Sequence, residues 1–330
     1  MTPAPLLLGD HQLDPPLLLA PMAAITTVPM RCVAEAFGAA LTYTEMVSTA
    51  ALFRGVKAAR ALLKPSSKGY PFAVQLFGSD PYEMEYAAHY ALNAGVHVLD
   101  INMGCPMKDI VRHGAGSALM KTPELAAQLV RAARRGVEES IPVTVKIRAG
   151  WDANAITATE FAKTMEQAGA QWITVHGRTR AQLYKGTSDP QVIAGVVQAV
   201  HVPVIANGDI RTAQDAKQIL EITGAQGVMV ARGSFGNPWL FRDIKRLFRG
   251  ESPLPPPTPK ERLEVLWHHL ELVKIHGENP AQKLMEIKKQ ISWYSKSLKD
   301  SSVFRNHLFR LNSLEEIETL IHNQFGKQLT

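Results

Sequence analysis

Eight short apolar runs, most of them rich in β-branched residues, recur along the first 230 residues, with stretches of helical periodicity between them. The runs are Leu17–Leu19, Leu41–Thr44, Phe72–Leu76, Val96–Ile101, Val143–Ile147, Trp172–Val175, Val202–Ile205 and Gly227–Val230. Near-continuous apolar strands that alternate with helices are typical of a parallel sheet covered on both faces. Eight such units predict an α/β fold of the closed (β/α)8 type, a TIM barrel. An open doubly wound sheet is the alternative, but no G-x-G-x-x-G motif follows the first run.

The composition changes at Ser252–Pro259, which is too rich in proline for a helix interior and predicts a stiff linker. Beyond it, Leu263, Leu266, Leu270 and Val273 follow helical spacing. We therefore predict a barrel domain over residues 1–250, a linker over 251–259 and a small all-helical domain over 260–330. A domain of that size rarely folds alone, so we expect it to pack on the barrel.

Polar and glycine residues gather directly after five of the runs. These clusters are Ala20–Met22, Asn102–Cys105, His176–Arg178, Asn207–Asp209 and Ala231–Gly233. In a TIM barrel the carboxyl ends of all the strands meet at one rim, where active sites are built. The sequence therefore predicts that the five clusters face one shared pocket.

Cys105 lies in a Gly-Cys-Pro turn at the end of the fourth run. Gly104 has wide backbone freedom and Pro106 has a fixed φ, so the thiol is expected on a stiff loop. The other cysteine, Cys32, lies in an apolar periodic segment that is typical of a structural residue. The residues alone leave Cys105 open between chemistry and packing.

The loops Asn207–Asp209 and Ala231–Ser234 follow the seventh and eighth runs, where TIM barrels commonly bind phosphate through backbone N–H groups. Ordinary glycine turns are the alternative. Lys146 lies inside the fifth run, where a lysine is costly unless it has a partner. Gln75 and His176 are similar polar residues near the same rim, and together they predict a polar cofactor.

Lysine and arginine total 36 against 30 acidic residues, a net charge of +6, which is compatible with a polyanionic partner but does not establish one. No apolar run of about 18 residues predicts a membrane helix, and we read no signal peptide. Two distant cysteines fit a reducing cytoplasm. No His-x-x-x-His or Cys-x-x-Cys spacing predicts a metal site.

The C-terminal segment places Lys283, Lys288, Lys289 and Lys296 near Trp293 and Tyr294. Basic residues beside aromatic ones suit a nucleic-acid surface. Thr258–Thr330 nevertheless holds 11 basic and 9 acidic residues, a net charge of only +2. A solvated helix face therefore stays open as the alternative.

Several collinear motifs resemble the tRNA-dihydrouridine synthase family, most closely its bacterial B-type branch. The motifs lie at Ala20–Thr26, Gln75–Pro81, Asp100–Pro106, Gly114–Leu119, Lys146–Trp151, His176–Arg180, Pro203–Asp209, Met229–Trp239 and Ile291–Tyr294. They cover the barrel almost from end to end. The resemblance implies an FMN-dependent, NADPH-driven enzyme that reduces a uridine of tRNA to 5,6-dihydrouridine.

The resemblance also implies roles for individual residues, with Cys105 as the proton donor. The implied FMN contacts are Ala20, Pro21, Met22, Gln75, Lys146, His176, Asn207, Gly208, Asp209, Ala231 and Arg232. Candidates to hold the uracil and neighbouring phosphate are Asn102, Arg178 and Arg180, and candidates for the wider RNA surface are Lys288 and Lys289. Some relatives have glycine where Ala231 stands, which a contact through the backbone would tolerate. We expect a monomer.

Two other functions stay open. A flavin oxidoreductase of free pyrimidines would share the barrel, the FMN and the active-site thiol, but the basic helical segment argues against it. An RNA-binding protein that keeps FMN as a structural ligand is the second alternative, and the presence of Cys105 and Lys146 argues against it. The modified uridine position is not encoded in any of these motifs.

Overall fold

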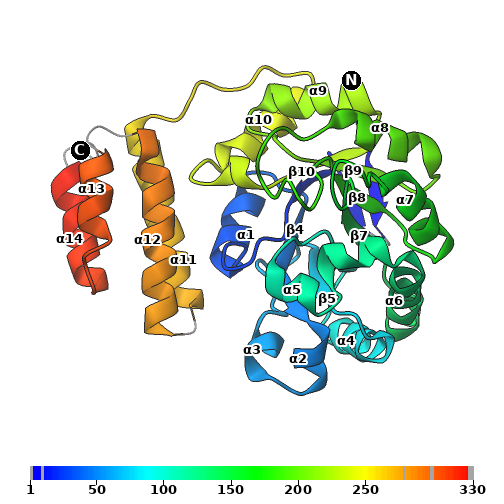
Figure 1. Ribbon diagram of the computed structural model, residues 1–330. Coiled ribbons are helices and arrows are strands. Elements are labelled where there is room, and N and C mark those ends of the chain that lie inside the picture. Colours follow the sequence, from blue (N-terminus) through cyan, green and yellow to red (C-terminus); the bar gives the residue numbers. More distant parts are fainter. Residues whose placement is uncertain (1–2, 9–10, 278, 298–300, 326–330) are drawn as a thin grey trace.

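The computed structural model describes residues 3–8, 11–277, 279–297 and 301–325. Eight parallel strands close into a barrel in the order β10-β3-β4-β5-β6-β7-β8-β9, which confirms the TIM-barrel prediction (Figure 1). The strands are β3 (Leu17–Leu19), β4 (Leu41–Ser48), β5 (Phe72–Phe77), β6 (Val98–Met103), β7 (Val143–Arg148), β8 (Ile173–His176), β9 (Val204–Asn207) and β10 (Gly227–Val230). Each of the eight predicted runs overlaps one of them.

Helices surround the barrel because the outward faces of the strands are apolar and need cover. The main ones are α1 (Val28–Ala36), α4 (Pro81–Asn93), α6 (Pro123–Gly136), α7 (Ala158–Gln167), α8 (Pro190–Ala199), α9 (Ala213–Thr223) and α10 (Trp239–Phe248). Small residues allow close packing between them. A Cβ on Gly136 would lie 2.3 Å from the backbone oxygen of Glu85, so α4 and α6 touch through their backbones.

Shorter elements occupy the loops at the carboxyl rim. They are α2 (Thr49–Phe53), α3 (Lys57–Ala61), α5 (Lys108–Arg112) and the 3-10 helices η1 (Gly116–Lys121) and η2 (Arg232–Ser234). In a TIM barrel these loops shape the active site, whereas the strands hold it rigid.

An N-terminal hairpin packs against the barrel interior, a feature that the sequence patterns do not reveal. Its antiparallel strands are β1 (Leu6–Leu8) and β2 (His11–Leu13). Leu6 and Leu13 are buried in the same cluster as the interior residues Leu18, Tyr43 and Trp172. Strands of three residues are too short for a period-2 pattern to stand out, so periodicity gives no sign of the hairpin.

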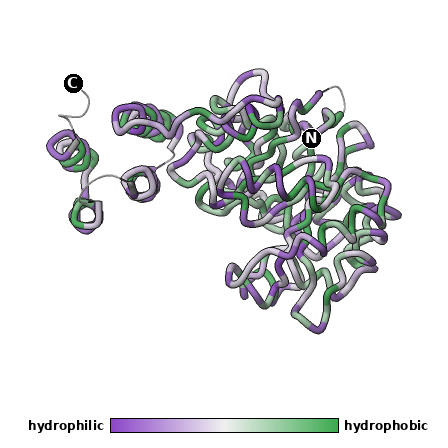
Figure 2. Tube along the Cα trace, turned by 90° about the horizontal axis from the view of Figure 1, so that it is seen from above, coloured by the Kyte–Doolittle hydropathy of each residue, from purple (hydrophilic) through white to green (hydrophobic). Residues whose placement is uncertain are grey.

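The C-terminal segment is helical, as predicted, with α11 (Pro259–His276), α12 (Pro280–Tyr294), η3 (Ser295–Ser297), α13 (Ser301–Leu308) and α14 (Leu314–Phe325). A capping box between Thr258 and Glu261 starts α11 directly after the proline-rich stretch. Figure 2 shows these helices nearly end-on beside the barrel. The residues Leu263, Leu266, Leu270 and Val273 are all buried in their shared core.

Aromatic contacts join these helices to the barrel. Trp239 of α10 is buried within the core of the C-terminal helices. The ring of Phe235 stacks on Trp293 with centroids 4.3 Å apart. A Cβ on Gly236 would lie 2.4 Å from the carbonyl carbon of Trp293, so only glycine allows this approach. Within the described residues, no helix has the length and apolar character needed to cross a bilayer.

Candidate active site

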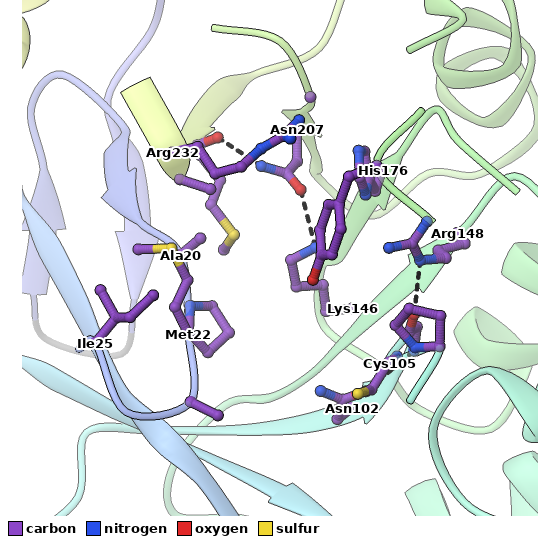
Figure 3. A pocket seen from close by; sticks show the side chains of 18 of the residues that line it. Ala20, Met22, Ile25, Asn102, Cys105, Lys146, Arg148, His176, Asn207 and Arg232 are labelled. Atoms are coloured by element: carbon purple, nitrogen blue, oxygen red, sulfur yellow. Dashed lines mark hydrogen bonds between the residues drawn. The ribbon is translucent and has the colours of Figure 1, made fainter. Parts of the chain in front are cut away.

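A pocket of about 520 Å³ opens at the carboxyl rim of the barrel. Figure 3 shows Asn102 and Cys105 at one side of it, Met22 and Ile25 at another, and Lys146 and Asn207 joined by a hydrogen bond. The predicted site residues that line it are Ala20, Pro21, Met22, Gln75, Asn102, Cys105, Lys146, His176, Asn207, Gly208, Asp209, Ala231 and Arg232. The five polar clusters therefore do face one shared pocket.

The loop that carries Cys105 is held by side-chain and backbone hydrogen bonds. The Oδ1 of Asn102 accepts from the N–H of Cys105 at 2.8 Å and from that of Gly104 at 3.2 Å. The Nε of Arg148 donates to the carbonyl oxygen of Gly104 at 2.7 Å. Gly116 has a φ of +60°, and a Cβ there would lie 2.7 Å from the Cys105 oxygen. The thiol is thus carried on a stiff loop at the end of β6.

The Cys105 thiol is half-buried, and burial raises its pKa above the ordinary value, although Arg148 and Lys146 act in the opposite sense. A thiol with a raised pKa keeps its proton at neutral pH. Cys105 is therefore suited to donate a proton rather than to attack as a thiolate.

A buried chain of polar side chains runs from the Cys105 loop into the barrel. The Nδ2 of Asn102 donates to Oε1 of Gln75 at 2.8 Å, and the Nε2 of Gln75 donates to Oδ2 of Asp100 at 2.6 Å. The hydroxyl of Thr144 donates to the other oxygen of Asp100 at 2.6 Å. Burial raises the pKa of Asp100 to about 6, so its carboxyl is largely ionised at neutral pH.

Lys146 projects from β7 toward the mouth, and its Nζ donates to Oδ1 of Asn207 at 2.9 Å. Asn207 is itself held by a hydrogen bond from its Nδ2 to the oxygen of Met229 at 2.7 Å. Burial and the neighbouring Arg148 lower the pKa of Lys146 to about 8. The ammonium is therefore largely charged at pH 7, and its one hydrogen-bond partner among the described residues is a neutral amide.

His176 is buried beside several cations. Burial, followed by the charges of Lys146 and Arg148, lowers its pKa well below the ordinary value. Its Nε2 accepts from Nη1 of Arg178 at 3.4 Å. The imidazole is therefore neutral at physiological pH, with its proton on Nδ1.

The loops after β9 and β10 form an anion-binding corner. Among the described residues, the backbone N–H groups of Gly208 and Asp209 have no hydrogen-bond acceptor. The guanidinium of Arg232 lies nearby, 3.6 Å from an oxygen of Asp209. Unpaired N–H groups beside an arginine suit a phosphate group. A Cβ on Gly233 would lie 2.2 Å from the oxygen of Ile210, so this corner requires glycine.

The carboxylate of Asp209 is committed to protein contacts and not to the pocket. It accepts from Nη2 of Arg178 at 2.7 Å and from the backbone N–H of Ser188 at 2.8 Å. Burial works against its ionisation, but these contacts outweigh burial and lower the pKa. The backbone N–H of Asp209, in contrast, has no acceptor among the described residues.

Comparison with known proteins identifies the architecture as that of one family. The family model described as "Dihydrouridine synthase (Dus)" matches residues 18–329. The chain belongs to the dihydrouridine synthase family. It is 38% identical to "tRNA-dihydrouridine synthase B" of Pasteurella multocida, over 90% of this chain and 89% of the relative. It is 37% identical to the protein of the same name from Pseudomonas aeruginosa, over 93% and 92% of the two chains. The resemblance to the B-type branch is thus confirmed.

Solved structures agree on the fold of this dihydrouridine synthase. One of them, a variant of NCR from Zymomonas mobilis, superimposes with a TM-score of 0.53. That likeness covers 79% of this chain and 94% of the other, at 16% sequence identity. At such low identity the similarity supports the barrel architecture alone.

Arg148 and Tyr184 are among the pocket residues that the sequence analysis of this dihydrouridine synthase did not single out. Arg148 lies two positions after Lys146 in β7, so strand periodicity places both on one face, a signal that could have found it. Tyr184 has 55% of its surface exposed at the mouth. The guanidiniums of Arg232 and Arg148 lie 5.0 Å and 5.8 Å from its ring centroid. Because Tyr184 belongs to an irregular loop, no periodic signal marks it.

The structure places Arg178 and Arg180, the predicted substrate contacts, outside the lining of the pocket. Arg178 is only 1% exposed, and its guanidinium is occupied by Asp209 and by the oxygens of Lys185 and Gly186. Arg180 does not line the pocket, and its guanidinium lies 4.5 Å from the ring centroid of Trp151. Both arginines shape the loops around the site and do not project into it.

Lys288 and Lys289, the predicted contacts to the wider RNA surface, differ in their surroundings. Lys288 is 7% exposed, and its Nζ donates to the oxygen of Phe309 at 3.3 Å. The Nζ of Lys289 donates to the oxygen of Ala24 at 3.4 Å, across to the loop after β3. Lys288 therefore belongs to the packing of the helical bundle, and Lys289 joins that bundle to the barrel.

Proposed function

We propose that this dihydrouridine synthase reduces a uridine of tRNA to 5,6-dihydrouridine, with FMN as its cofactor and NADPH as its reductant. The observation that carries the proposal is the convergence of a protonated thiol, a buried ammonium and an anion-binding corner on one pocket. The names of the relatives, which specify tRNA, support the choice of substrate.

The pocket residues fit FMN in both charge and shape. Its phosphate suits the unpaired N–H groups of Gly208 and Asp209 together with the N–H of Ala231 and the guanidinium of Arg232. Its ring suits a cavity with apolar walls and a few polar groups, and the candidate ring contacts are Ala20, Pro21, Met22, Gln75, Lys146, His176 and Asn207. When bound and reduced by NADPH, FMN would supply the hydride that adds to C6 of the uracil.

Cys105 provides the proton that completes the reduction. Addition of hydride at C6 leaves negative charge over C5 and O4 of the uracil, and a proton must then reach C5. The raised pKa keeps the thiol protonated, and the stiff loop keeps it in a fixed position. The resulting thiolate regains its proton from solvent, because Cys105 is only half-buried.

Lys146 supplies positive charge near this proton transfer, and Asn102 positions the loop that carries the donor. The positive charge of Lys146 offsets negative charge on the bound cofactor, in a buried site where such charges interact strongly. Asn102 holds the N–H of Cys105 and is also in reach of a base in the pocket. A base inside folded tRNA cannot enter this pocket, so the uridine must turn out of its stack.

The test uses the purified full-length protein with its bound flavin, NADPH and unmodified tRNA. Dihydrouridine measured by mass spectrometry should appear in tRNA, with NADPH consumed in equal amount. Free uridine and uracil serve as competing substrates and should react far more slowly. A flavin-free folded protein, or equal turnover of free uridine and tRNA, would contradict the proposal.

A further inference from the structure

The stretch between Glu45 and Asp80 concentrates positive charge. It contains Arg54, Lys57, Arg60, Lys64 and Lys68 and no acidic residue, a net charge of +5 in a chain whose total is +6. The stretch includes α2 and α3, which project from the barrel at the bottom of Figure 1. The barrel fold does not require this concentration of positive charge. The charge therefore points to a role in binding a partner.

The basic side chains of this stretch are available to a partner. Arg54, Lys57, Arg60 and Lys68 are all exposed. Among the described residues, the side chains of Arg54, Lys57 and Lys68 form no ion pair. Arg60 lies over the ring of Tyr90, 5.2 Å from its centroid. Exposed cations without carboxylate partners favour binding to a polyanion.

Exposed aromatic rings adjoin these cations. Phe53 of α2 contacts Tyr82 and Tyr86 of α4, with ring centroids 5.6 Å and 5.2 Å apart. Tyr82 is 71% exposed, and the other two rings are also exposed. Aromatic faces beside basic side chains are the combination that binds unpaired nucleotides, because each base can stack on a ring.

This surface lies on the same rim as the pocket. Helix α2 begins directly after β4, and Tyr82 lies in the first turn of α4, just beyond β5. These two strands also contribute Met46 and Gln75 to the pocket. The hydroxyl of Ser79 donates to the oxygen of His113 at 2.7 Å, which joins the loop before α4 to the end of α5.

The α5 region extends the surface to the mouth of the pocket. Met107 lines the pocket and is exposed, and the exposed Lys108 follows it at the start of α5. The surface therefore runs from the pocket mouth outward to α2 and α3. A large substrate that delivers one nucleotide to the pocket would pass over it.

We propose that this surface, formed by Phe53, Arg54, Lys57, Tyr82 and Tyr86 and here called the α2–α3 surface, binds the substrate RNA outside the reacting nucleotide. The inference rests on the proposed function. The basic side chains contact phosphates, and Tyr82 stacks on an unpaired base. Another RNA contact is called for because Lys288 is buried in the helical bundle and the Nζ of Lys289 already donates to the oxygen of Ala24.

The first experiment compares two double variants of the flavin-loaded full-length protein. One carries Arg54→Gln and Lys57→Gln. The matched control carries Arg131→Gln and Arg249→Gln, which removes the same charge from α6 and the end of α10. Affinity for unmodified tRNA is measured over a range of salt concentrations.

The α2–α3 variant should lose about 1 to 2 units from the slope of log affinity against log salt, because each phosphate contact contributes nearly one unit. The control should keep the slope of the parent protein. Both variants should retain full flavin content and normal NADPH oxidation. A Tyr82→Ala variant should bind about tenfold more weakly with an unchanged slope, as loss of base stacking requires.

The outcomes separate this inference from the proposed function. If the parent protein forms dihydrouridine in tRNA but both double variants bind tRNA alike, the α2–α3 surface is not an RNA site and the proposed function stands. If the parent protein modifies no tRNA, the proposed function itself fails. If the α2–α3 variant instead loses binding to vesicles rich in phosphatidylserine and keeps its tRNA affinity, the partner is a membrane surface and the inference is overturned.

Discussion

Gln75 donates an Nε2 hydrogen to Oδ2 of the buried Asp100 over 2.6 Å, and this contact fixes the orientation of the groups that hold Cys105. An ionised carboxylate only accepts hydrogen bonds, so Gln75 must present its NH2 group to Asp100. Its Oε1 then accepts from Asn102, whose own Oδ1 is left to accept from the N–H of Cys105. Asp100 thus acts on the thiol loop through two amides, as a positioning residue.

Replacing Asp100 by leucine should misplace the thiol more than it disturbs the flavin. We expect Asp100→Leu to slow uridine reduction about 100-fold, the cost of a catalytic group displaced by about 1 Å. Reduction of the flavin by NADPH should fall much less, which stopped-flow absorbance can measure. Thr144→Val removes only the other contact to Asp100 and should cost less than Asp100→Leu. Equal losses in both half-reactions would show that Asp100 has only a structural role.

The Cys105→Ala variant should keep its flavin and oxidise NADPH normally, because the thiol acts only after hydride transfer begins. Dihydrouridine formation should fall by about 10² to 10⁴, the usual contribution of a general acid. Single-turnover assays with tRNA measure this step directly. Cys32→Ala is the control, since Cys32 lies on α1 outside the pocket. Near-normal turnover by Cys105→Ala would exclude a proton-donating role.

Flavin affinity should depend on pH through Lys146. The pKa of Lys146 in the flavin-free protein is lowered to about 8, so the ammonium loses its charge as the pH rises through this value. If the charged form of Lys146 favours the bound cofactor, affinity should fall above pH 8 by up to about tenfold per pH unit. Fluorescence titration with FMN at several pH values measures this affinity. Lys146→Met should bind more weakly and show no such fall.

Removing Arg178 should weaken the corner that we assign to phosphate. Arg178→Met removes the hydrogen bonds from its guanidinium to the Asp209 carboxylate, and loss of hydrogen bonds to a charged group costs about 1.5 to 3 kcal/mol. We expect a lower thermal midpoint and weaker flavin binding. Arg180→Met should cost about 1 kcal/mol or less, because it loses only a contact with the Trp151 ring. Equal losses of flavin affinity in Arg178→Met and Arg180→Met would contradict the assignment of this corner to phosphate.

Lys288 should not contribute to RNA binding, in contrast to the interpretation from sequence. Its side chain is buried and bonded to the oxygen of Phe309. We expect Lys288→Met to leave the salt dependence of tRNA affinity unchanged. A salt slope lower by about one unit would mean that Lys288 does reach a phosphate.

Much of the fold follows from local patterns. The eight strand runs and the helices around them depend on periodic apolar residues, and such periodicity is visible in a single sequence. The proline-rich stretch marks the start of the C-terminal helices, and Leu263 to Val273 show their buried face. The N-terminal hairpin leaves no such pattern, because its burial depends on the barrel end that it covers.

The candidate site is predictable where it depends on position along a strand. Residues that follow parallel strands must share one rim, so the order of the chain alone brings Lys146, His176 and Asn207 together. The direction in which a loop side chain points cannot be predicted in this way, because it depends on packing between segments that are distant in the chain. That is why Arg178, whose position after β8 predicts a substrate contact, turns toward Asp209 instead.

The sequence by itself determined the barrel, the shared pocket and the family, because each depends on residue types in a fixed order along the chain. Only the tertiary structure decided which charges are free to act. It paired Arg178, buried Lys288 and left Arg54 and Lys57 exposed without carboxylate partners among the described residues. The physical reason is that a charge acts according to its burial and its neighbours, and both are set by contacts between segments far apart in the chain.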